Sequence, residues 1–580
     1  MAVAAEQPNR KFWFGPDHKT LADFASASHG RAVAWLVMVC LLTFLPGFWS
    51  IPPVDRDEAR FAQATKQMLE TGDYVDIRFQ DESRYKKPVG IYWLQAGAVK
   101  LGEALGVPRA RTRIGLYRIP SLLGATGAVL ATYWAALAFV SRRAALLAGL
   151  MLASCFLLGA EARLAKTDAT LLFTVVIAMG ALGRTYLAAQ AGAQPSAQSS
   201  IQSWRLPTIF WTALAAGILI KGPLILMFVA LAATALIAVD RRAAWLLRLK
   251  PLPGIAWMLL LVLPWFIAIV LKSGDSFFAE SLGHDLFEKL GSGQESHGAP
   301  PGTYLLLFWV TFFPGAILTG LAAPAIWRAR EEAGAKFLLA WIVPAWIVLE
   351  IVVTKLPHYV LPLYPAIAIL IAGVVDNHAL SRRPWLLTAP VWWFIGSIAL
   401  TIVALTLHIR FGQQTGVLAW PFLVAAMIVM MFAWWLYEVD GPESALLRAL
   451  TGTLLLSWAL FGATFPAIPQ LFPANELAKY IRFTEACGDP QIVTTGYHEP
   501  SLVFLIGTSL RHANSGADAA EFLKSGGCRF ALVEARQERS FAQRADTLGV
   551  RYSKGMRFDG INLSGGRAIS MTVYRAEGSP

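Results

Sequence analysis

Two adjacent carboxylates, Asp57 and Glu58, come soon after the first long apolar run of the chain, which ends near Trp49. Charges are costly inside hydrocarbon, so an acidic pair just outside a predicted membrane span indicates a reactive centre that faces water. A basic run follows at residues 85–88, with the sequence Tyr-Lys-Lys-Pro. Together the two segments predict a site that handles an anionic group at the membrane surface.

The composition is that of a membrane protein. The chain has 580 residues, of which 56% are hydrophobic, and it contains 21 tryptophans; this is too apolar for a soluble enzyme. The net charge of +12 resides in short clusters between apolar runs, so topology and anionic lipid explain it better than nucleic acid does. No cleavable signal peptide is evident, and we expect the first span to be retained as an anchor.

Hydropathy predicts about thirteen membrane spans, because about 20 apolar residues in a helix are needed to cross a bilayer. The apolar runs lie at residues 32–50, 114–140, 144–161, 169–190, 206–220, 222–239, 253–271, 303–327, 336–353, 356–375, 385–408, 416–437 and 446–465. The run at 206–220 is short, and residues 221–223 either separate two spans or break a single long one.

Arginine and lysine clusters between the predicted spans fall on one side, which the positive-inside rule makes cytoplasmic. This places the N-terminus inside and the C-terminus outside. The opposite side collects loops with carboxylates, lysines and histidines, at 51–113, 161–168, 221, 272–302 and 355–359. These loops are either simply polar or converge on one site. We favour convergence, because the first loop is far longer than a connector needs to be.

We predict an α-helical polytopic membrane protein with a C-terminal soluble α/β domain. Its parts are a cytoplasmic N-terminus at 1–31, a transmembrane region at 32–465 that includes the loops 51–113 and 272–302, and the α/β domain at 466–580. In the first loop, residues 59–69 and 88–106 form helices that either lie flat at the interface or pack as short helices. In the last part we expect helices at 475–486, 517–524 and 539–548, and strands at 491–495, 501–506, 530–534 and 569–574.

Several well-known chemical motifs are absent. The sequence contains no glycine-rich phosphate loop, no His-Glu-x-x-His and no Gly-x-Ser-x-Gly, which argues against a nucleotide-driven pump, a zinc protease and a serine hydrolase. His284 and His297 lie near Glu280 and Asp285. They either hold a divalent metal ion or are unliganded, as lone histidines in polar loops usually are. We expect no cofactor to be required.

The four cysteines show no metal-type spacing. Cys40 and Cys155 lie in apolar runs and are predicted to be packing residues. Cys487 and Cys528 would both lie in an oxidising compartment outside the membrane, which permits a disulfide between them.

Six segments, in this order, resemble the membrane-embedded polyprenyl-phosphate-dependent glycosyltransferases of the GT-C class. They are Asp57–Phe61, Lys87–Trp93, Arg118–Ser121, Asp168, Lys221-Gly222 and Lys355–Tyr359. Within this class the chain is most similar to the family of lipid A 4-amino-4-deoxy-L-arabinose transferases, which is related to the protein O-mannosyltransferases. The family often has a glutamate where this chain has Lys86, so the site loses a carboxylate and gains a positive charge.

The resemblance implies a GT-C fold in the bacterial inner membrane, with the active site facing the periplasm. It implies an inverting transfer of aminoarabinose from undecaprenyl phosphate to a lipid A phosphate, which gives resistance to polymyxin. The expected partners are this lipid-linked donor, the lipid A acceptor and the surrounding membrane lipid, but no nucleic acid.

The resemblance also implies roles for individual residues. Asp57 and Asp168 are the candidate catalytic carboxylates. The candidate substrate-binding residues are Arg60, Lys86, Lys87, Lys221, His358 and Tyr359. A leaving phosphate needs fixed cations, and we expect Arg60 and Lys87 to supply them, with a hydrogen bond from Tyr359.

Some of these roles stay open. Asp57 acts as a general base, positions the acceptor, pairs with the sugar ammonium, or caps the following helix. An acceptor phosphate is already anionic at neutral pH, so it does not need to lose a proton. Lys86 and Lys221 either bind phosphate or extend their ammonium groups to the membrane interface.

Two other functions are compatible with the sequence. A related enzyme would move a different sugar from polyprenyl phosphate to protein or to a glycan. A transporter of lipid-linked sugar would instead show internal repeats and charged or broken helices at mid-membrane. We see no duplicated halves, and the polar residues cluster at one face, so we favour a transferase.

Overall fold

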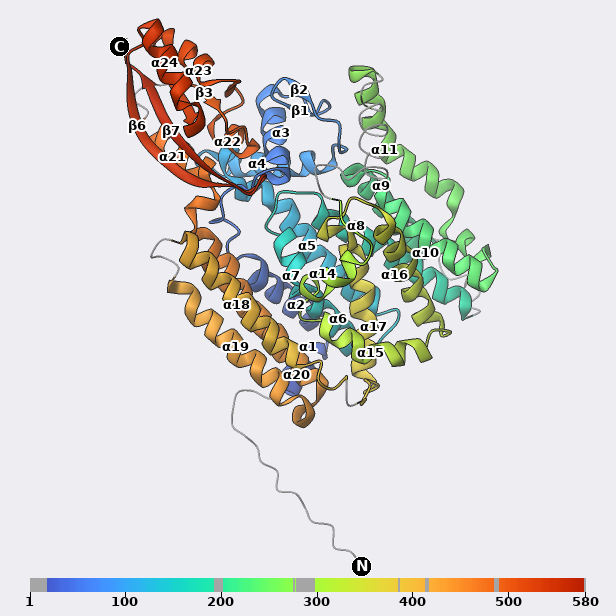
Figure 1. Ribbon diagram of the computed structural model, residues 1–580. Helices are drawn as coiled ribbons and strands as arrows, with labels where there is room; N and C mark the ends of the chain where they lie inside the picture. Colours follow the sequence, from blue (N-terminus) through green and yellow to red (C-terminus); the bar gives the residue numbers. More distant parts are fainter. Residues whose placement is uncertain are drawn as a thin grey trace, which may run out of the picture.

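The molecule is built mostly from helices, with a sheet near its C-terminus (Figure 1). This computed structural model describes residues 18–191, 202–274, 277, 298–383, 386–412, 417–484 and 490–577. The helices of the apolar part are α1 (His18–Ser26), α2 (His29–Phe44), α5 (Ile114–Ala136), α6 (Arg142–Ala153), α7 (Phe156–Glu161), α8 (Asp168–Gln190), α9 (Gln202–Lys221), α10 (Leu224–Asp240), α11 (Pro251–Ser273), α14 (Thr303–Thr311), α15 (Ala316–Arg328), α16 (Ala333–Ile351), α17 (Tyr364–Asp376), α18 (Val391–Phe411), α19 (Ala419–Trp435) and α20 (Tyr437–Ser457).

Each predicted span coincides with one helix or with a pair. Among the described residues, seven helices are long and apolar enough to cross a membrane, and α2, α10 and α19 are shorter apolar helices. The predicted span 303–327 is a pair, α14 and α15, bent by 115°. The predicted span 144–161 is also two helices, α6 and α7. The molecule is therefore a multi-pass membrane protein, while the number of thirteen spans stays a prediction.

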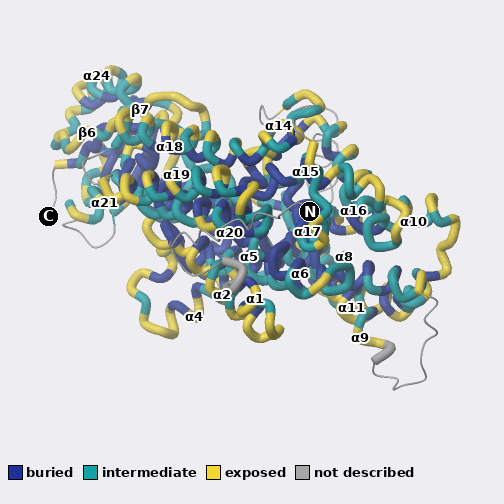
Figure 2. The backbone as a smooth tube through the Cα atoms, turned by 90° about the horizontal axis from the view of Figure 1, so that it is seen from below, coloured by how far each residue is buried: buried dark blue, intermediate teal, exposed yellow. Residues whose placement is uncertain are grey.

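Burial is deepest in the middle of the bundle. Figure 2 shows α5 and α6 largely in dark blue, whereas α10, at the edge, carries many exposed positions. The same contrast separates α8, which is 72% buried inside the protein, from α11 and α18, which are 22% and 17% buried. The exposed side chains of these outer helices are mainly apolar, as a helix face in contact with lipid requires.

The first loop forms two packed helices, α3 (Asp57–Thr71) and α4 (Gly90–Ala104), joined through a short hairpin of β1 (Arg78–Phe79) and β2 (Glu82–Ser83). α3 ends at Gly72, whose φ of 74° is readily adopted by glycine. Residues of α3 are buried almost without interruption from Glu58 to Leu69, because α4 and the C-terminal α22 (Pro500–Ile506) pack on it. Of the two alternatives for this segment, the structure shows a packed helix.

A buried ion pair holds the first loop against the bundle. The Arg118 guanidinium on α5 donates to both carboxylate oxygens of Glu58, at 2.7 and 2.9 Å, and neither side chain is more than 1% exposed. Arg118 also donates to the carbonyl oxygens of Phe48 and Ile51. Glu58 in turn accepts from the backbone amide of Ala165. Three stretches of chain are thus joined by two charged side chains that satisfy one another.

The C-terminal region has a five-stranded sheet in the order β4-β3-β5-β7-β6, in which β3 is parallel to β4 and β5, and β7 is antiparallel to β5 and β6. Its elements are α21 (Pro473–Thr484), β3 (Gln491–Thr495), α22, β4 (Arg511–Ala513), α23 (Gly516–Lys524), β5 (Arg529–Glu534), α24 (Glu538–Leu548), β6 (Tyr552–Asn562) and β7 (Arg567–Ala576). Cys528 is disulfide-bonded, whereas Cys487 lies outside the described residues.

The sequence predicts most of these elements, but the strand expected at 501–506 is wrong. That segment is the helix α22, which Pro500 begins at its first position. Residues 501–505 are all buried, so the segment lacks the alternation of polar and apolar residues that separates a strand from a helix. The sequence patterns do not predict β4 or β6. β6 is the edge strand of the sheet, and its exposed side lacks an apolar signal.

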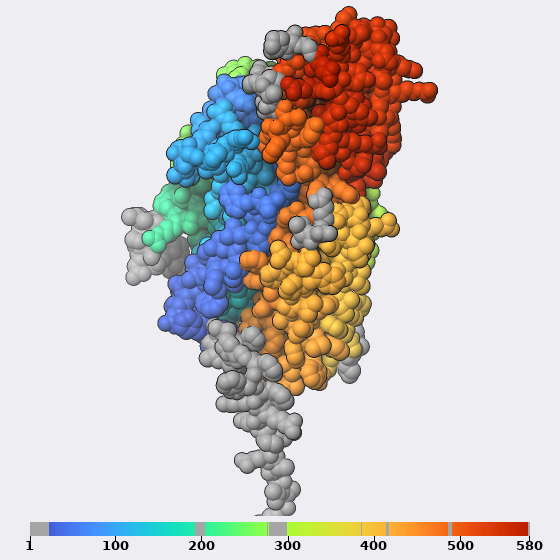
Figure 3. Space-filling model, turned by 90° about the vertical axis from the view of Figure 1, so that its left-hand side faces the viewer, coloured from blue at the N-terminus to red at the C-terminus, as the bar shows by residue number. Residues whose placement is uncertain are grey.

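The C-terminal region shares a core with the first loop. Tyr117 of α5 and Phe504 of α22 stack edge to face with ring centroids 5.2 Å apart, within an apolar cluster that also contains Val99 of α4 and Leu532 of β5. Figure 1 and Figure 3 show the red C-terminal region and the light-blue first loop at the same end of the molecule, far from α1. The predicted boundary of a separate domain at 466 stays a prediction.

We predict that Glu58→Ala strongly destabilises the protein. The change leaves the Arg118 guanidinium buried without its carboxylate, which costs about 3–5 kcal/mol. Unfolding titrations of the purified protein in detergent measure the loss. Arg111→Ala is the matched control, because it removes an ion pair with Glu103 whose two partners are 44% and 36% exposed, and such pairs contribute about 0–1 kcal/mol. Equal, small losses in both variants would contradict the anchoring role of Glu58.

Candidate active site

A cavity of about 330 Å³ lies where the first loop meets the end of the helix bundle. Its wall comes from separate stretches of chain: the start of α3 with the residues before it, the loop at 84–87, the turn at 164–168, the end of α9 and the segment 354–359. The lining residues are Val54, Asp55, Arg56, Asp57, Glu58, Arg60, Phe61, Arg84, Lys86, Lys87, Leu164, Lys166, Thr167, Asp168, Lys221, Thr354, Leu356, His358 and Tyr359.

The cavity gathers the site residues that the sequence singles out. Those among the described residues that line it are Asp57, Arg60, Lys86, Lys87, Asp168, Lys221, His358 and Tyr359. They are separated by up to about three hundred positions in the sequence, and the topology brings them to one end of the bundle. Their chemical roles stay predictions. His284 and His297, the predicted metal ligands, lie outside the described residues.

Asp168 and Lys221 face each other because two neighbouring helices place them at the same level. Asp168 is the first residue of α8 and Lys221 the last residue of α9, and these two helices pack side by side. Their carboxylate and ammonium groups form an ion pair. An acidic group at a helix N-terminus and a basic group at a helix C-terminus are both favoured by the helix dipoles.

Lys166 and Glu161, which are not among the predicted site residues, extend this pair into a buried network. Lys166 lies 3.2 Å from a carboxylate oxygen of Glu161 and 3.6 Å from one of Asp168. His358 bridges the same two carboxylates, with each ring nitrogen 3.5 Å from one of them. Burial alone would lower the pKa of Lys166, but Glu161, Asp168 and Asp57 raise it above its usual value. Lys166 is therefore a fixed positive charge beside Asp57.

The described lining residues carry more positive than negative charge. Seven of them are basic and four are acidic, and one of the acidic residues, Glu58, is already neutralised by Arg118 behind the wall. A cavity with this surplus attracts an anion, and its arginines and lysines are the groups that proteins use to bind phosphate. The arrangement can hold a phosphate group next to a carboxylate.

One group of described residues has the types that bind metal ions. Ligand atoms of Glu161, Asp168 and His358 lie within 4.8 Å of one another. However, the carboxylates are already paired with the ammonium groups of Lys166 and Lys221, and a divalent ion would have to displace both. We therefore interpret the group as an ion-pair network and assign no metal to it.

The two residues before Asp57 are bound to the C-terminal region. The Asp55 carboxylate accepts hydrogen bonds from the Tyr497 hydroxyl at 3.2 Å and from the Ser501 backbone amide at 3.1 Å. Burial raises the pKa of Asp55 from its usual 3.8 to about 6, and Glu499 adds to the rise while the hydrogen bonds oppose it. These partners lie more than four hundred residues along the chain, so no local pattern in the sequence indicates them.

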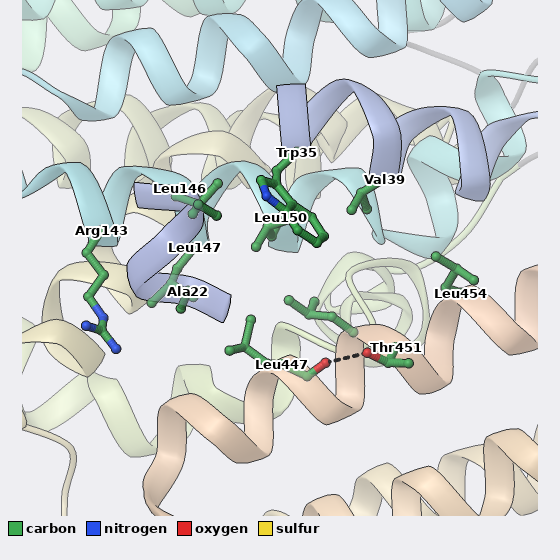
Figure 4. A pocket seen from close by; sticks show the side chains of 12 residues that line it. Ala22, Trp35, Val39, Arg143, Leu146, Leu147, Leu150, Leu447, Thr451 and Leu454 are labelled. Atoms are coloured by element: carbon green, nitrogen blue, oxygen red, sulfur yellow. Dashed lines mark hydrogen bonds between the residues drawn. The ribbon is translucent and has the colours of Figure 1, made fainter. Parts of the chain in front are cut away.

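A second cavity, of about 150 Å³, lies at the other end of the bundle, between α1, α2, α6 and α20 (Figure 4). It is lined mainly by leucines, with Trp35 and Val39 from α2 pointing into it. Arg143 is the one charged residue of its lining, and it pairs with Glu443 and Asp23. The lining of this cavity is suited to contact with hydrocarbon, and among its lining residues no acidic side chain or histidine is present for acid–base chemistry.

Comparisons with known proteins find relatives of this chain among glycosyltransferases. Residues 53–273 match the family described as dolichyl-phosphate-mannose-protein mannosyltransferase. The chain is 28% identical over 443 residues to the undecaprenyl phosphate-alpha-4-amino-4-deoxy-L-arabinose arabinosyl transferase of Pseudomonas aeruginosa, and 29% identical over 325 residues to that of Erwinia tasmaniensis. The match spans 74% of the first relative and 54% of the second.

The structural comparison covers nearly the whole chain. The crystal structure of ArnT from Cupriavidus metallidurans bound to undecaprenyl phosphate superimposes with a TM-score of 0.73 over 94% of this chain and 98% of that one, at 19% sequence identity. The chain has the GT-C fold. The apo state of the same protein gives a TM-score of 0.72. The resemblance to the aminoarabinose transferases and their protein mannosyltransferase relatives, predicted from the motifs, is thereby confirmed.

We predict that Asp55→Asn stabilises the protein at neutral pH but not at low pH. The wild-type carboxyl has a folded-state pKa above its unfolded value, so its favourable contribution is complete below about pH 4 and is lost as the pH rises through about 6. The ionised form then costs on the order of 3 kcal/mol, which the neutral amide avoids. Thermal unfolding of both proteins between about pH 3.5 and 8, a range that brackets the unfolded and the folded pKa, tests this. A difference that does not change with pH would refute it.

Proposed function

We propose that this chain transfers 4-amino-4-deoxy-L-arabinose from undecaprenyl phosphate to a phosphate group of lipid A, at the periplasmic face of the inner membrane. The observation that carries the proposal is the cation-rich cavity beside Asp57, at the end of a membrane bundle with the GT-C fold. The names of the relatives supply the sugar and the carrier lipid. On this proposal the added ammonium would cancel surface charge and weaken polymyxin binding.

The chemistry is a substitution at the anomeric carbon of the sugar. A lipid A phosphate oxygen forms the new bond to this carbon, and the bond to the undecaprenyl phosphate oxygen breaks with its electron pair. The configuration is inverted. Both phosphates are anionic, so the reaction needs positive charge more than it needs a proton acceptor. Arg60 and Lys87 supply this charge in our proposal, and Tyr359 and Lys86 line the same cavity.

Asp57 carries a different task. The Asp57 carboxylate lies near enough to Lys166 to raise the pKa of that ammonium. A carboxylate in this place can pair with the ammonium of an amino sugar or hold the acceptor in place. We propose that Asp57 orients the reacting groups. Asp168, which pairs with Lys221 and lies near His358, would hold these two basic side chains in place.

The orientation in the membrane belongs to the same proposal. Cys528 is disulfide-bonded, and disulfides persist in oxidising compartments such as the periplasm. The C-terminal region and the first loop lie at the same end of the molecule (Figure 1). The opposite end carries the N-terminal helix α1 and the basic pair Arg142-Arg143. This arrangement favours a periplasmic site and a cytoplasmic N-terminus.

We expect Lys87→Ala to weaken the binding of undecaprenyl phosphate by about 1.5–3 kcal/mol, because one charge-assisted hydrogen bond is lost. Binding of undecaprenyl phosphate to the purified protein in detergent measures the effect. Lys100→Ala is the matched control. Lys100 is exposed on α4, and within the described residues its ammonium group lies over the Tyr74 ring, away from the cavity lining. Unchanged affinity in Lys87→Ala, together with lost transfer, would assign Lys87 another role.

The proposal is tested by the mass of lipid A. Strains that carry no copy of the gene, the wild-type protein or Asp57→Asn are grown alike, with the donor pathway induced. We expect aminoarabinose-modified lipid A only with the wild type, because Asp57→Asn removes the charge with little change of shape. Polymyxin sensitivity should follow the lipid A masses.

The variant must be shown to reach the membrane at wild-type levels, so that lost activity is not lost protein. Unmodified lipid A in all three strains would contradict the proposal. It would then favour a relative's activity, namely transfer of another sugar from polyprenyl phosphate to protein, as in the mannosyltransferase family that matches residues 53–273.

A further inference from the structure

The backbone immediately before Asp57 is strained. Arg56 has φ 66° and ψ −110°, a conformation that a residue with a side chain rarely adopts and that costs on the order of 1–3 kcal/mol. Such strain persists only where surrounding contacts impose it. Because Arg56 sits at the cap position of α3, its conformation sets the direction in which the chain enters that helix and hence the place of Asp57.

Residues of the C-terminal region form hydrogen bonds with both Asp55 and Arg56. On one side, Asp55 accepts from the Tyr497 hydroxyl and the Ser501 amide. On the other, the Arg56 guanidinium donates to the Ser564 carbonyl oxygen. Ser564 is held in turn, since its hydroxyl donates to Glu499 at 2.8 Å. The segment after β3 thus binds Asp55, and the turn between β6 and β7 binds Arg56. The three strands belong to the same sheet.

Glu58, two residues after Arg56, is bound by residues outside the C-terminal region. Glu58 is fixed by Arg118 and by the backbone amides of Val54 and Ala165. Asp57 therefore lies between a residue pair held by the C-terminal region and a residue held by the bundle. Tyr497 is fully buried and does not line the cavity, so it does not touch a substrate there, whereas its hydroxyl does bind Asp55.

We infer that the C-terminal region is a positioning element of the active site: Tyr497, Ser501 and Ser564 hold Asp55 and Arg56 in the strained conformation that presents Asp57 to the substrate. This inference rests on the proposed function for its effect on turnover. It assigns the C-terminal region a part in the reaction that goes beyond covering the first loop. Tyr497 and Asp55 are positioning residues, and neither needs to touch the substrate.

The same interface offers a matched control. The Thr508 hydroxyl donates to Glu70 near the other end of α3, so Glu70→Gln weakens docking of the same two regions without touching Asp55 or Arg56. Asp55→Ala removes both hydrogen bonds to the C-terminal region, and Tyr497→Phe removes one. Asp55→Asn keeps an acceptor for the Ser501 amide and serves as the conservative variant.

The test uses the full-length protein in detergent and two readouts. Hydrogen exchange of the backbone amides at residues 54–60 reports the local order, and steady-state transfer from the lipid-linked donor reports turnover. We expect Asp55→Ala to speed exchange at 54–60 and to lower kcat by about 10- to 100-fold, as a misplacement of about 1 Å would. The KM for the donor should change less than kcat does, because Lys86 and Lys87, two of the proposed phosphate-binding cations, lie in a separate loop of the cavity wall.

Tyr497→Phe should lower kcat by about threefold to tenfold, equivalent to one hydrogen bond, and Asp55→Asn should restore most of the rate lost in Asp55→Ala. Glu70→Gln should leave exchange at 54–60 and kcat at wild-type values. Unchanged exchange at 54–60 in Asp55→Ala, or an equal loss of kcat in Glu70→Gln, would overturn the inference. Faster exchange in a protein whose wild type transfers no sugar would refute the proposed function and leave the positioning role standing.

Discussion

The contact between Arg118 and Glu58 is the interaction on which the rest of the site depends. A guanidinium and a carboxylate that are almost fully buried must satisfy each other, because either one alone would cost several kcal/mol in this environment. The same two groups bind backbone from the end of the first span, from the first loop and from the turn at 165. The first loop and the turn at 165 are two of the stretches that form the cavity wall, so the position of this ion pair helps to set the shape of the cavity.

Around this anchor, the charges form two layers. The deeper layer, with Glu161, Lys166, Asp168 and Lys221, is nearly balanced, and its members are paired with one another. The outer layer holds Arg60, Lys86 and Lys87 and is predominantly positive. Pairing offsets part of the cost of burying the charges of the deeper layer and holds its side chains in place. The outer layer then presents positively charged side chains, already held in place, to an anionic group. Preorganised cations of this kind lower the barrier to departure of a phosphate.

Local sequence patterns were sufficient to predict much of this. Asp168 stands at the edge of an apolar run, and the Asp57-Glu58 pair and the Lys87 motif lie in the loop between the first two runs, so all of them are expected at one end of a bundle. The pairing of Asp55 with Tyr497 could not be predicted, because a hydrogen bond across more than four hundred residues leaves no periodic signal. Lys166 and Glu161 were visible as charges between two spans, but their burial depends on how α7 and α8 pack. The helix α22 was mistaken for a strand because a short, mostly apolar segment fits both structures.

The position of those distant partners has a consequence for how the protein is made. Synthesis proceeds from the N-terminus at about 5–20 residues per second, so the segment at 55–58 leaves the ribosome on the order of tens of seconds before Tyr497 and Ser564 exist. A nascent chain already contains every motif of the GT-C class while the peptide before Asp57 still lacks the contacts that hold its strained backbone. Competence of the site therefore has to wait until Tyr497 and Ser564 have been synthesised and folded, long after the motifs themselves are present.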